Sequence, residues 1–222
     1  MSSITTSPLI ARLWLGDGLR ALRDTRTLSG TEAGRLLGTD RVGISRMEQG
    51  KRRTRTSVVM SYLEALGLSE RDDEYKRLVR LARAAEVRGW WEAATYAGMG
   101  PRQIRTADIE NGAAVVRQYQ PTMLPGLVQT EAYARGRSEA LLAEDAEFDL
   151  DEEFDLEVTL AGRARRQEEI FGRDEPKVEY EVIVEELAIR RLVVEPEVMR
   201  GQLCHLLDLV TKAAITLRVV PV

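Results

Sequence analysis

The sequence has 222 residues and a mass of 24.9 kDa, the length of one large domain or two small ones. No apolar run approaches the roughly 20 residues that span a membrane, so we expect no membrane association. Cys204 and His205 are the only cysteine and the only histidine, which excludes an intramolecular disulfide and a four-ligand zinc site. A Ser-His-Asp triad is disfavoured because no serine follows Ser138. A lone cysteine fits a reducing cytoplasm, where we expect the protein to reside.

The charge is unevenly distributed along the chain. Residues 1–56 carry 11 Lys and Arg against 5 Asp and Glu, a balance of +6, whereas the remaining residues carry 21 against 31, a balance of −10. The basic density is highest over residues 51–55, and nine of the fourteen residues 144–157 are acidic. The acidic run is typical of an exposed or partly disordered segment. This asymmetry indicates two modules, of which the first is suited to a polyanion.

Two helices are predicted in the first 38 residues. Residues 12–23 carry leucines at helical spacing, at Leu15, Leu19 and Leu22. Ser29 and Glu32 have the spacing of a capping box, which predicts the start of a second, short helix. Gly38 is expected to end this helix in the left-handed conformation.

A third helix is predicted immediately afterwards, over residues 41–49. Asp40 is a good N-cap for it, and Ile44 and Met47 are spaced three apart as its buried pair. Two short helices joined by a three- to four-residue turn that contains glycine follow the helix-turn-helix plan.

Two more helices complete the N-terminal domain. One is predicted by an apolar stripe over residues 58–66, and the other begins with a capping-box-like Ser69 and Asp72 and reaches about residue 88. The pattern breaks at Gly89, and we place the boundary between there and Pro101. The predicted domains are residues 1–90 and 91–222.

The second half mixes element types and predicts a smaller sheet with helices. Alternating and β-branched segments predict three strands, over residues 113–119, 178–184 and 215–220. Helical patterns cover residues 130–142, 156–171, 186–192 and 196–212. The expected fold class is therefore α+β, with an all-α five-helix domain followed by a mixed α/β domain.

The segment Ile44-Ser-Arg-Met-Glu-Gln-Gly-Lys-Arg52 resembles the end of the recognition helix in the XRE family of Cro/lambda-repressor-type helix-turn-helix proteins. The resemblance covers about residues 12–68. It departs at Gly30, where the family often has glutamine, and at Gly43, where a larger residue is common. Gly43 suggests either a close backbone approach, to DNA or to the preceding helix, or a neutral replacement.

The resemblance implies that the second helix of the pair enters the major groove of double-stranded DNA. Because Ile44 and Met47 point inward, the residues on its reading face are Arg41, Val42, Ser45 and Arg46. The residues expected to hold phosphates are Gly30, Thr31, Gln49, Lys51, Arg52 and Arg53. The family position also implies a structural ion pair between Arg23 and Glu48.

The rest of the chain is similar to the C-terminal domain of actinobacterial WhiJ-like regulators, whose biochemistry is poorly defined. Four blocks carry this likeness in order and spacing: GWW at 89–91, YQPTMLPGLVQTEAYAR at 119–135, RARRQ at 163–167 and VMRGQL at 198–203. The related domain continues past the strand that here ends at Val222, so we expect a short form or a truncated one.

These observations predict a DNA-binding transcriptional regulator that acts as a homodimer, and whose C-terminal domain senses a small-molecule effector or a partner protein. An alternative is an antitoxin-like protein that binds a small partner and uses DNA binding for autoregulation. An enzyme ranks last, and we expect no cofactor or metal. Arg163, Arg166 and Gln167 suit either an acidic ligand or pairing with the acidic segment upstream, whereas Trp90 and Trp91 suit packing better than a ligand cleft.

Overall fold

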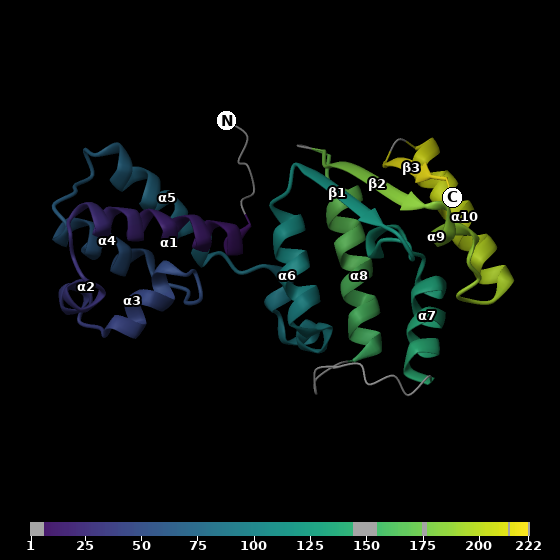
Figure 1. Cartoon of the computed structure of the whole chain (residues 1–222), viewed down its shortest axis with the longest axis horizontal. Helices are drawn as coiled ribbons and strands as arrows, with labels where there is room; N and C mark the ends of the chain where they lie inside the picture. Colours follow the sequence, from purple (N-terminus) through teal and green to yellow (C-terminus); the bar gives the residue numbers. More distant parts are fainter. Residues whose placement is uncertain (1–6, 144–154, 175–176, 213, 222) are drawn as a thin grey trace. The chain divides into compact units, whose positions relative to one another are not determined.

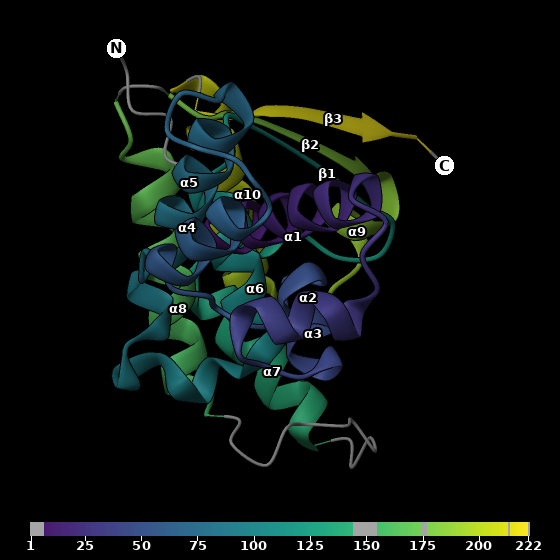
Figure 2. The ribbon, with the colours of Figure 1, turned by 90° about the vertical axis from the view of Figure 1, so that its left-hand side faces the viewer.

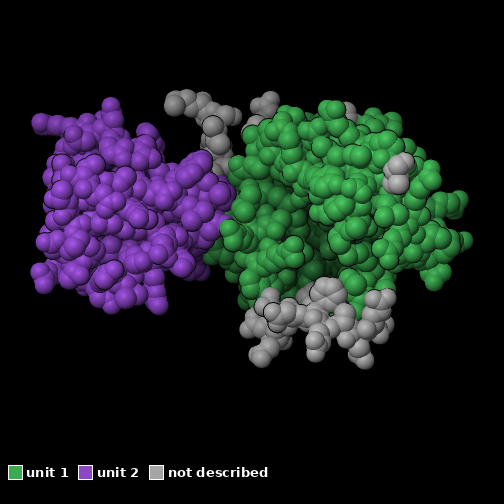
Figure 3. Space-filling model, in the orientation of Figure 1, with its two compact units in different colours: residues 1–4, 91–222 green, residues 5–90 purple. Residues whose placement is uncertain are grey.

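The computed structural model describes residues 7–143, 155–174, 177–212 and 214–221. The chain divides into two compact units, Thr5–Trp90 and a second made mainly of Trp91–Val222 (Figures 1 and 3). No helix in the described part of the chain is long and apolar enough to cross a membrane.

The first unit is all-α, as the sequence predicts. Its described residues form five helices: α1 (Pro8–Thr25), α2 (Gly30–Leu37), α3 (Arg41–Glu48), α4 (Thr56–Ala65) and α5 (Asp73–Glu86). Helix α1 begins four residues earlier than predicted, because Ser7 caps it and Pro8 occupies its first turn. The unit has its own core, in which Leu19, Ile44, Tyr62, Leu63 and Leu78 are almost completely buried.

Local sequence fixes the turn between α2 and α3 (Figure 2). Ser29 and Glu32 form the predicted capping box, and Gly38 ends α2 with a φ of 63°. Asp40 then caps α3 by accepting a hydrogen bond from the N–H of Gly43 at 2.7 Å. Both short helices are therefore delimited by their own sequence, and the helix-turn-helix prediction is confirmed.

Glycines let the backbone elements of this unit approach closely. A Cβ on Gly16 of α1 would lie 2.2 Å from the carbonyl oxygen of Glu48 in α3. A Cβ on Gly34 of α2 would lie 2.7 Å from the carbonyl oxygen of Thr39 in the turn. These contacts are far shorter than van der Waals distance, so α1, the turn and the helix pair can pack this way only with glycine at both positions.

The start of α5 differs from the prediction. Asp72 is its N-cap residue, but its side chain makes no capping hydrogen bond to the helix. The Asp72 carboxylate instead accepts hydrogen bonds from the N–H of Ser69 at 2.7 Å and from its hydroxyl at 3.0 Å. The carboxylate thus orders the turn before α5 and leaves the helix without a side-chain cap.

The second unit is the predicted mixture of helices and a small sheet. Its helices are α6 (Gly100–Asn111), α7 (Glu131–Ala143), α8 (Leu156–Phe171), α9 (Glu186–Arg190) and α10 (Pro196–Thr211), and its strands are β1 (Val115–Gln120), β2 (Glu179–Glu185) and β3 (Thr216–Val220). Short 3₁₀ turns occupy Trp90–Glu92, Ala94–Met99 and Gly126–Val128.

The three strands pair in parallel in the order β1-β2-β3 (Figure 1). Tyr180, Val182 and Val184 point to the covered face of β2 and are 2% exposed or less, whereas Glu181 lies on the opposite face. On that open face Glu181 accepts hydrogen bonds from Arg117 of β1 and Arg218 of β3. The helices therefore cover one face of the sheet, and charged side chains occupy the other.

Helix α6 was missed by the sequence analysis, which assigned Gly100 and Pro101 to a domain boundary. Pro101 fits the first turn of a helix, and the inward face of α6 carries Asp108 and Glu110 beside Ala107. Arg166 of α8 neutralises Glu110, its Nε and Nη2 each donating to a Glu110 oxygen at 2.7 Å. A buried ion pair replaces the apolar stripe by which a helix is normally recognised in sequence.

Candidate nucleic-acid interface

Helix α3 buries one face and exposes the other. Ile44 and Met47 are 1% and 5% exposed and pack into the core of the first unit. Of the predicted base-reading residues, Arg41, Val42 and Arg46 are exposed and Ser45 is half-buried. Val42 is 54% exposed, so the outer face of α3 carries one apolar side chain beside its polar ones.

Arg23 of α1 and Glu48 form an ion pair that holds α3 against α1. The Arg23 guanidinium donates from Nε to Oε1 at 2.6 Å and from Nη2 to Oε2 at 3.1 Å, and its Nη1 donates to the carbonyl of Leu28 at 2.8 Å. The two side chains are 14% and 9% exposed. The hydrogen bond to Glu48 raises the pKa of Arg23 above its ordinary value. This bidentate geometry fixes the orientation of α3 as well as its position.

A polar depression of about 360 Å³ lies on one side of α3. Helix α3 contributes Arg41 and Ser45 to it, and Gln49 follows at the end of α3. Helix α1 contributes Arg20, and Gly30, the first residue of α2, also lines it. Gln49 donates a hydrogen bond to the hydroxyl of Ser45 at 3.1 Å, so these two side chains form one polar surface. The arginines give the depression a positive charge beside the exposed face of α3.

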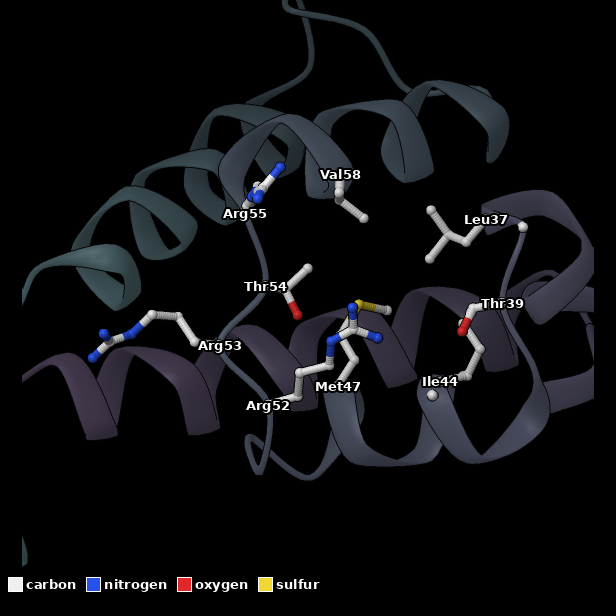
Figure 4. A pocket seen from close by; sticks show the side chains of 11 residues that line it. Leu37, Thr39, Ile44, Met47, Arg52, Arg53, Thr54, Arg55 and Val58 are labelled. Atoms are coloured by element: carbon white, nitrogen blue, oxygen red, sulfur yellow. The ribbon is translucent and has the colours of Figure 1, made fainter.

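A second depression, of about 460 Å³, lies on the other side of α3 (Figure 4). Arg52, Arg53 and Arg55 line it together with Thr39 and apolar side chains. The Arg52 side chain points into the space above Met47, whereas that of Arg53 extends away from the other labelled side chains (Figure 4). Cationic residues therefore flank α3 on both sides.

The residues predicted to hold phosphates differ in how well they are placed. Lys51, Arg52 and Gln49 are exposed, and Arg53 is half-buried. Thr31 is exposed at the start of α2, outside the lining of both depressions.

The N-terminus of α2, where Gly30 and Thr31 are predicted to bind a phosphate, already carries a negative charge from Glu32. The Glu32 carboxylate accepts hydrogen bonds from the N–H and the hydroxyl of Ser29, at 2.8 and 2.6 Å. These hydrogen bonds lower the pKa of Glu32 and keep it ionised. A fixed negative charge in the first turn opposes a phosphate at the N–H groups of Gly30 and Thr31.

Sequence reasoning missed Arg20 and Arg55 as members of this surface. Arg20 lies three residues before Arg23, so the predicted ion pair with Glu48 already implied that it neighbours α3. Its side chain is 66% exposed and lies 3.9 Å from a carboxylate oxygen of Asp24. Arg55 precedes α4 and belongs to the basic run over residues 51–55.

The structure gives a different reason for Gly43 from the close backbone approach to DNA or to the preceding helix that the sequence suggested. A Cβ at this position would lie 2.3 Å from the hydroxyl oxygen of Thr39 and 3.2 Å from a carboxylate oxygen of Asp40. The close neighbour is thus the turn itself, and neither DNA nor the body of α2 is needed to explain the glycine.

Two of the three basic residues of α8, Arg163 and Arg166, are wholly or partly buried and bind neighbouring side chains. Arg166 is 5% exposed and binds Glu110, and Arg163 donates to Gln129 at 2.7 Å. Gln167 donates to the carbonyl oxygens of Leu127 and Gln129, at 3.0 and 2.8 Å. Arg163 and Gln167 therefore hold the segment after β1 against α8, whereas Arg166 holds α6 against it. Residues 144–154 of the acidic segment lie outside the described residues.

Trp91 is 2% exposed, as packing requires, and Trp90 is half-buried.

Within the described residues no group of three or more His, Cys, Asp or Glu side chains is arranged to hold a metal ion.

Two family models match the chain. A helix-turn-helix domain matches residues 14–78, and a domain of unknown function, DUF5753, matches residues 103–222. No curated protein and no solved structure matches. The first match covers most of α1 and all of α2 and α3 with the surface just described, and the second takes in more than half of the chain. The chain belongs to the DUF5753 family and joins that domain to an N-terminal helix-turn-helix domain.

Proposed function

We propose that the protein is a sequence-specific regulator of transcription that binds double-stranded DNA through α3, and that its nearest functional class is the WhiJ-like group of XRE-type regulators. The observation that carries the proposal is the position of α3, an exposed polar helix with arginines on both sides of it. An α-helix with its side chains is about 10–12 Å wide, which matches the roughly 12 Å major groove.

The residues divide into two roles in this complex. Arg41 and Arg46 donate hydrogen bonds to base edges, for which guanine is the best acceptor, and Val42 covers a thymine methyl group. Ser45 contributes a hydroxyl beside them. The cations in the flanking depressions face the two phosphate chains that border the groove, with Arg20 on one side and Arg52 on the other.

The second unit supplies the regulatory part of the proposed function. We propose that it senses a small molecule or partner protein, that the protein acts as a cytoplasmic homodimer, and that it catalyses no reaction. The acidic balance of −10 outside residues 1–56 supports a role other than DNA contact. Regulation of this kind requires that the effector bind the DNA-bound and free states with different affinities.

Selection of bound fragments from genomic DNA tests the proposal. The full chain should enrich a small number of fragments that share a motif, and binding should weaken steeply with salt because counterions are released. The variant Arg41→Ala should lose this enrichment, whereas Arg200→Ala, which removes an exposed arginine of α10, should retain it. Recovery of unrelated fragments, or of none, would contradict sequence-specific binding.

A further inference from the structure

The second unit contains a pocket of its own, whose lining residues take no part in the surface around α3. It has a volume of about 360 Å³ and is lined by Thr122 and Met123 after β1, by α7, and by the residues that follow α9. Helix α7 contributes Arg137, Ala140 and Leu141, and the segment after α9 contributes Arg191, Leu192 and Val193. The volume falls within the roughly 300–1,000 Å³ of sites that hold small organic ligands.

The two arginines of this pocket differ from six other arginines of the second unit in their partners. Arg117, Arg135, Arg165, Arg166, Arg190 and Arg218 all pair with carboxylates of the same unit. Arg137 and Arg191 have no such partner within the described part of the chain. Arg137 is half-buried, and a partly desolvated guanidinium without a counter-charge is costly in a protein unless a ligand neutralises it.

Arg163 adds to the positive potential near α7. Burial, together with the charges of Arg166 and Arg137, lowers the pKa of Arg163 to about 10. Within the described residues its guanidinium donates to the neutral amide oxygen of Gln129 and to no carboxylate, so the positive charge beside Arg137 is not cancelled there. An anion near Arg137 would relieve this repulsion.

The remaining wall of the pocket is apolar. Met123, Leu141 and Val193 are half-buried, and Leu192 is 64% exposed. An exposed leucine beside two guanidinium groups that pair with no carboxylate of the described residues offers an apolar surface next to a cationic one. A ligand that suits both surfaces must itself be amphipathic.

We propose that this pocket binds a small organic anion, with a carboxylate head between Arg137 and Arg191 and an apolar body against Met123, Leu141 and Leu192. The planar guanidinium group suits a carboxylate because it donates two parallel hydrogen bonds to it. Binding of the anion to the pocket can be measured in the absence of DNA. Only the role of this anion as the regulatory effector rests on the proposed function.

Titration of the full-length protein with octanoate tests the site, with 1-octanol as the neutral analogue of equal chain length. The readouts are the heat of binding and the displacement of the fluorescent apolar anion 8-anilinonaphthalene-1-sulfonate. Octanoate should bind at least about tenfold more tightly than octanol, and Arg137→Gln combined with Arg191→Gln should remove that preference.

A matched control keeps the net charge of this double variant. Arg102→Gln combined with Arg200→Gln removes two exposed arginines outside the pocket and should leave octanoate binding unchanged. Failure of octanoate to bind, or equal loss in both double variants, overturns the proposed site. Binding of octanoate by a chain that binds no DNA would support the site and reject the proposed function, so the two failures are distinguishable.

Discussion

At the scale of single residues, the position of α3 depends on one partly buried ion pair. Arg23 satisfies Glu48 with two hydrogen bonds and uses a third donor on the carbonyl of Leu28. A charge held this way is stabilising only while its partner is present, because the remaining group cannot recover its hydration.

The first prediction concerns this pair. Glu48→Gln should lower the free energy of unfolding by about 2 kcal/mol, since it leaves the Arg23 charge partly buried. Adding Arg23→Met to it should cost less than the sum of the single changes. Urea unfolding of the two single variants and the double variant measures the coupling, and strictly additive effects would show that the pair does not link α1 to α3.

The second prediction concerns Tyr62, which lies in the core behind Glu48. Burial is the main cause that raises its pKa to about 12, and the negative charge of Glu48 adds to it. An unfolded tyrosine ionises near pH 10. Between pH 10 and about 12 the unfolded chain releases the Tyr62 proton, whereas the folded chain retains it. The contribution of this tyrosine to the free energy of unfolding is therefore complete below pH 10 and is lost as the pH rises to about 12.

The comparison with Tyr62→Phe isolates this contribution. Between pH 10 and 12 the stability of the wild-type protein should fall more steeply than that of the variant, as followed by urea unfolding at each pH. Parallel pH profiles would mean that Tyr62 ionises equally easily in both states.

At the scale of secondary-structure elements, the helices whose caps and buried residues lie close together in sequence could be predicted. The capping box of α2, the N-cap Asp40 and the apolar pair of α3 lie within a few residues of the elements that they define. Helix α6 was missed because its buried side is polar, and Arg166, which makes that possible, lies 56 residues away from Glu110. The partners of Arg163 and Arg166 are also distant in sequence, so the burial of these two arginines could not be predicted.

The residues of the candidate site could also be predicted only in part from the sequence. The outward residues of α3 could be predicted from the burial of Ile44 and Met47. The flanking cation Arg20 was missed, although its place one helical turn before Arg23 indicates it once α1 is packed against α3. That packing depends in turn on Gly16, whose importance is visible only when the backbone of Glu48 is in place.

The third prediction tests this close approach. Gly16→Ala should destabilise the first unit by more than about 2 kcal/mol and weaken DNA binding, because its Cβ would lie 2.2 Å from the backbone oxygen of Glu48. Gly201→Ala in α10, where a Cβ meets no other atom within 4 Å, should be neutral or stabilising. Thermal unfolding monitored by circular dichroism compares the two, and a neutral Gly16→Ala would refute the packing.

At the scale of the whole molecule, two units with separate cores carry opposite charge balances. The first core draws on all five helices α1–α5, and none of its members comes from the second unit. Such a unit can fold without the rest of the chain.

The fourth prediction follows from this separation. Residues 1–90 alone should unfold cooperatively and bind DNA with a steep salt dependence, whereas residues 91–222 should bind none. Circular dichroism and fluorescence anisotropy on labelled DNA measure the two properties. A fragment 1–90 that remains unfolded, or DNA binding that requires residues 91–222, would show that the units are not independent.

The central claim is that α3 reads bases while the flanking cations hold phosphates, and selection on randomised duplex DNA tests it most directly. Selections with the wild-type protein, Arg41→Ala and Arg52→Ala are run at two salt concentrations. Arg41→Ala should relax one or two base positions and cost about 1–3 kcal/mol on the selected site. Arg52→Ala should keep the motif, weaken all sequences equally and reduce the salt slope by about one. An unchanged motif for Arg41→Ala together with an altered motif for Arg52→Ala would contradict the account.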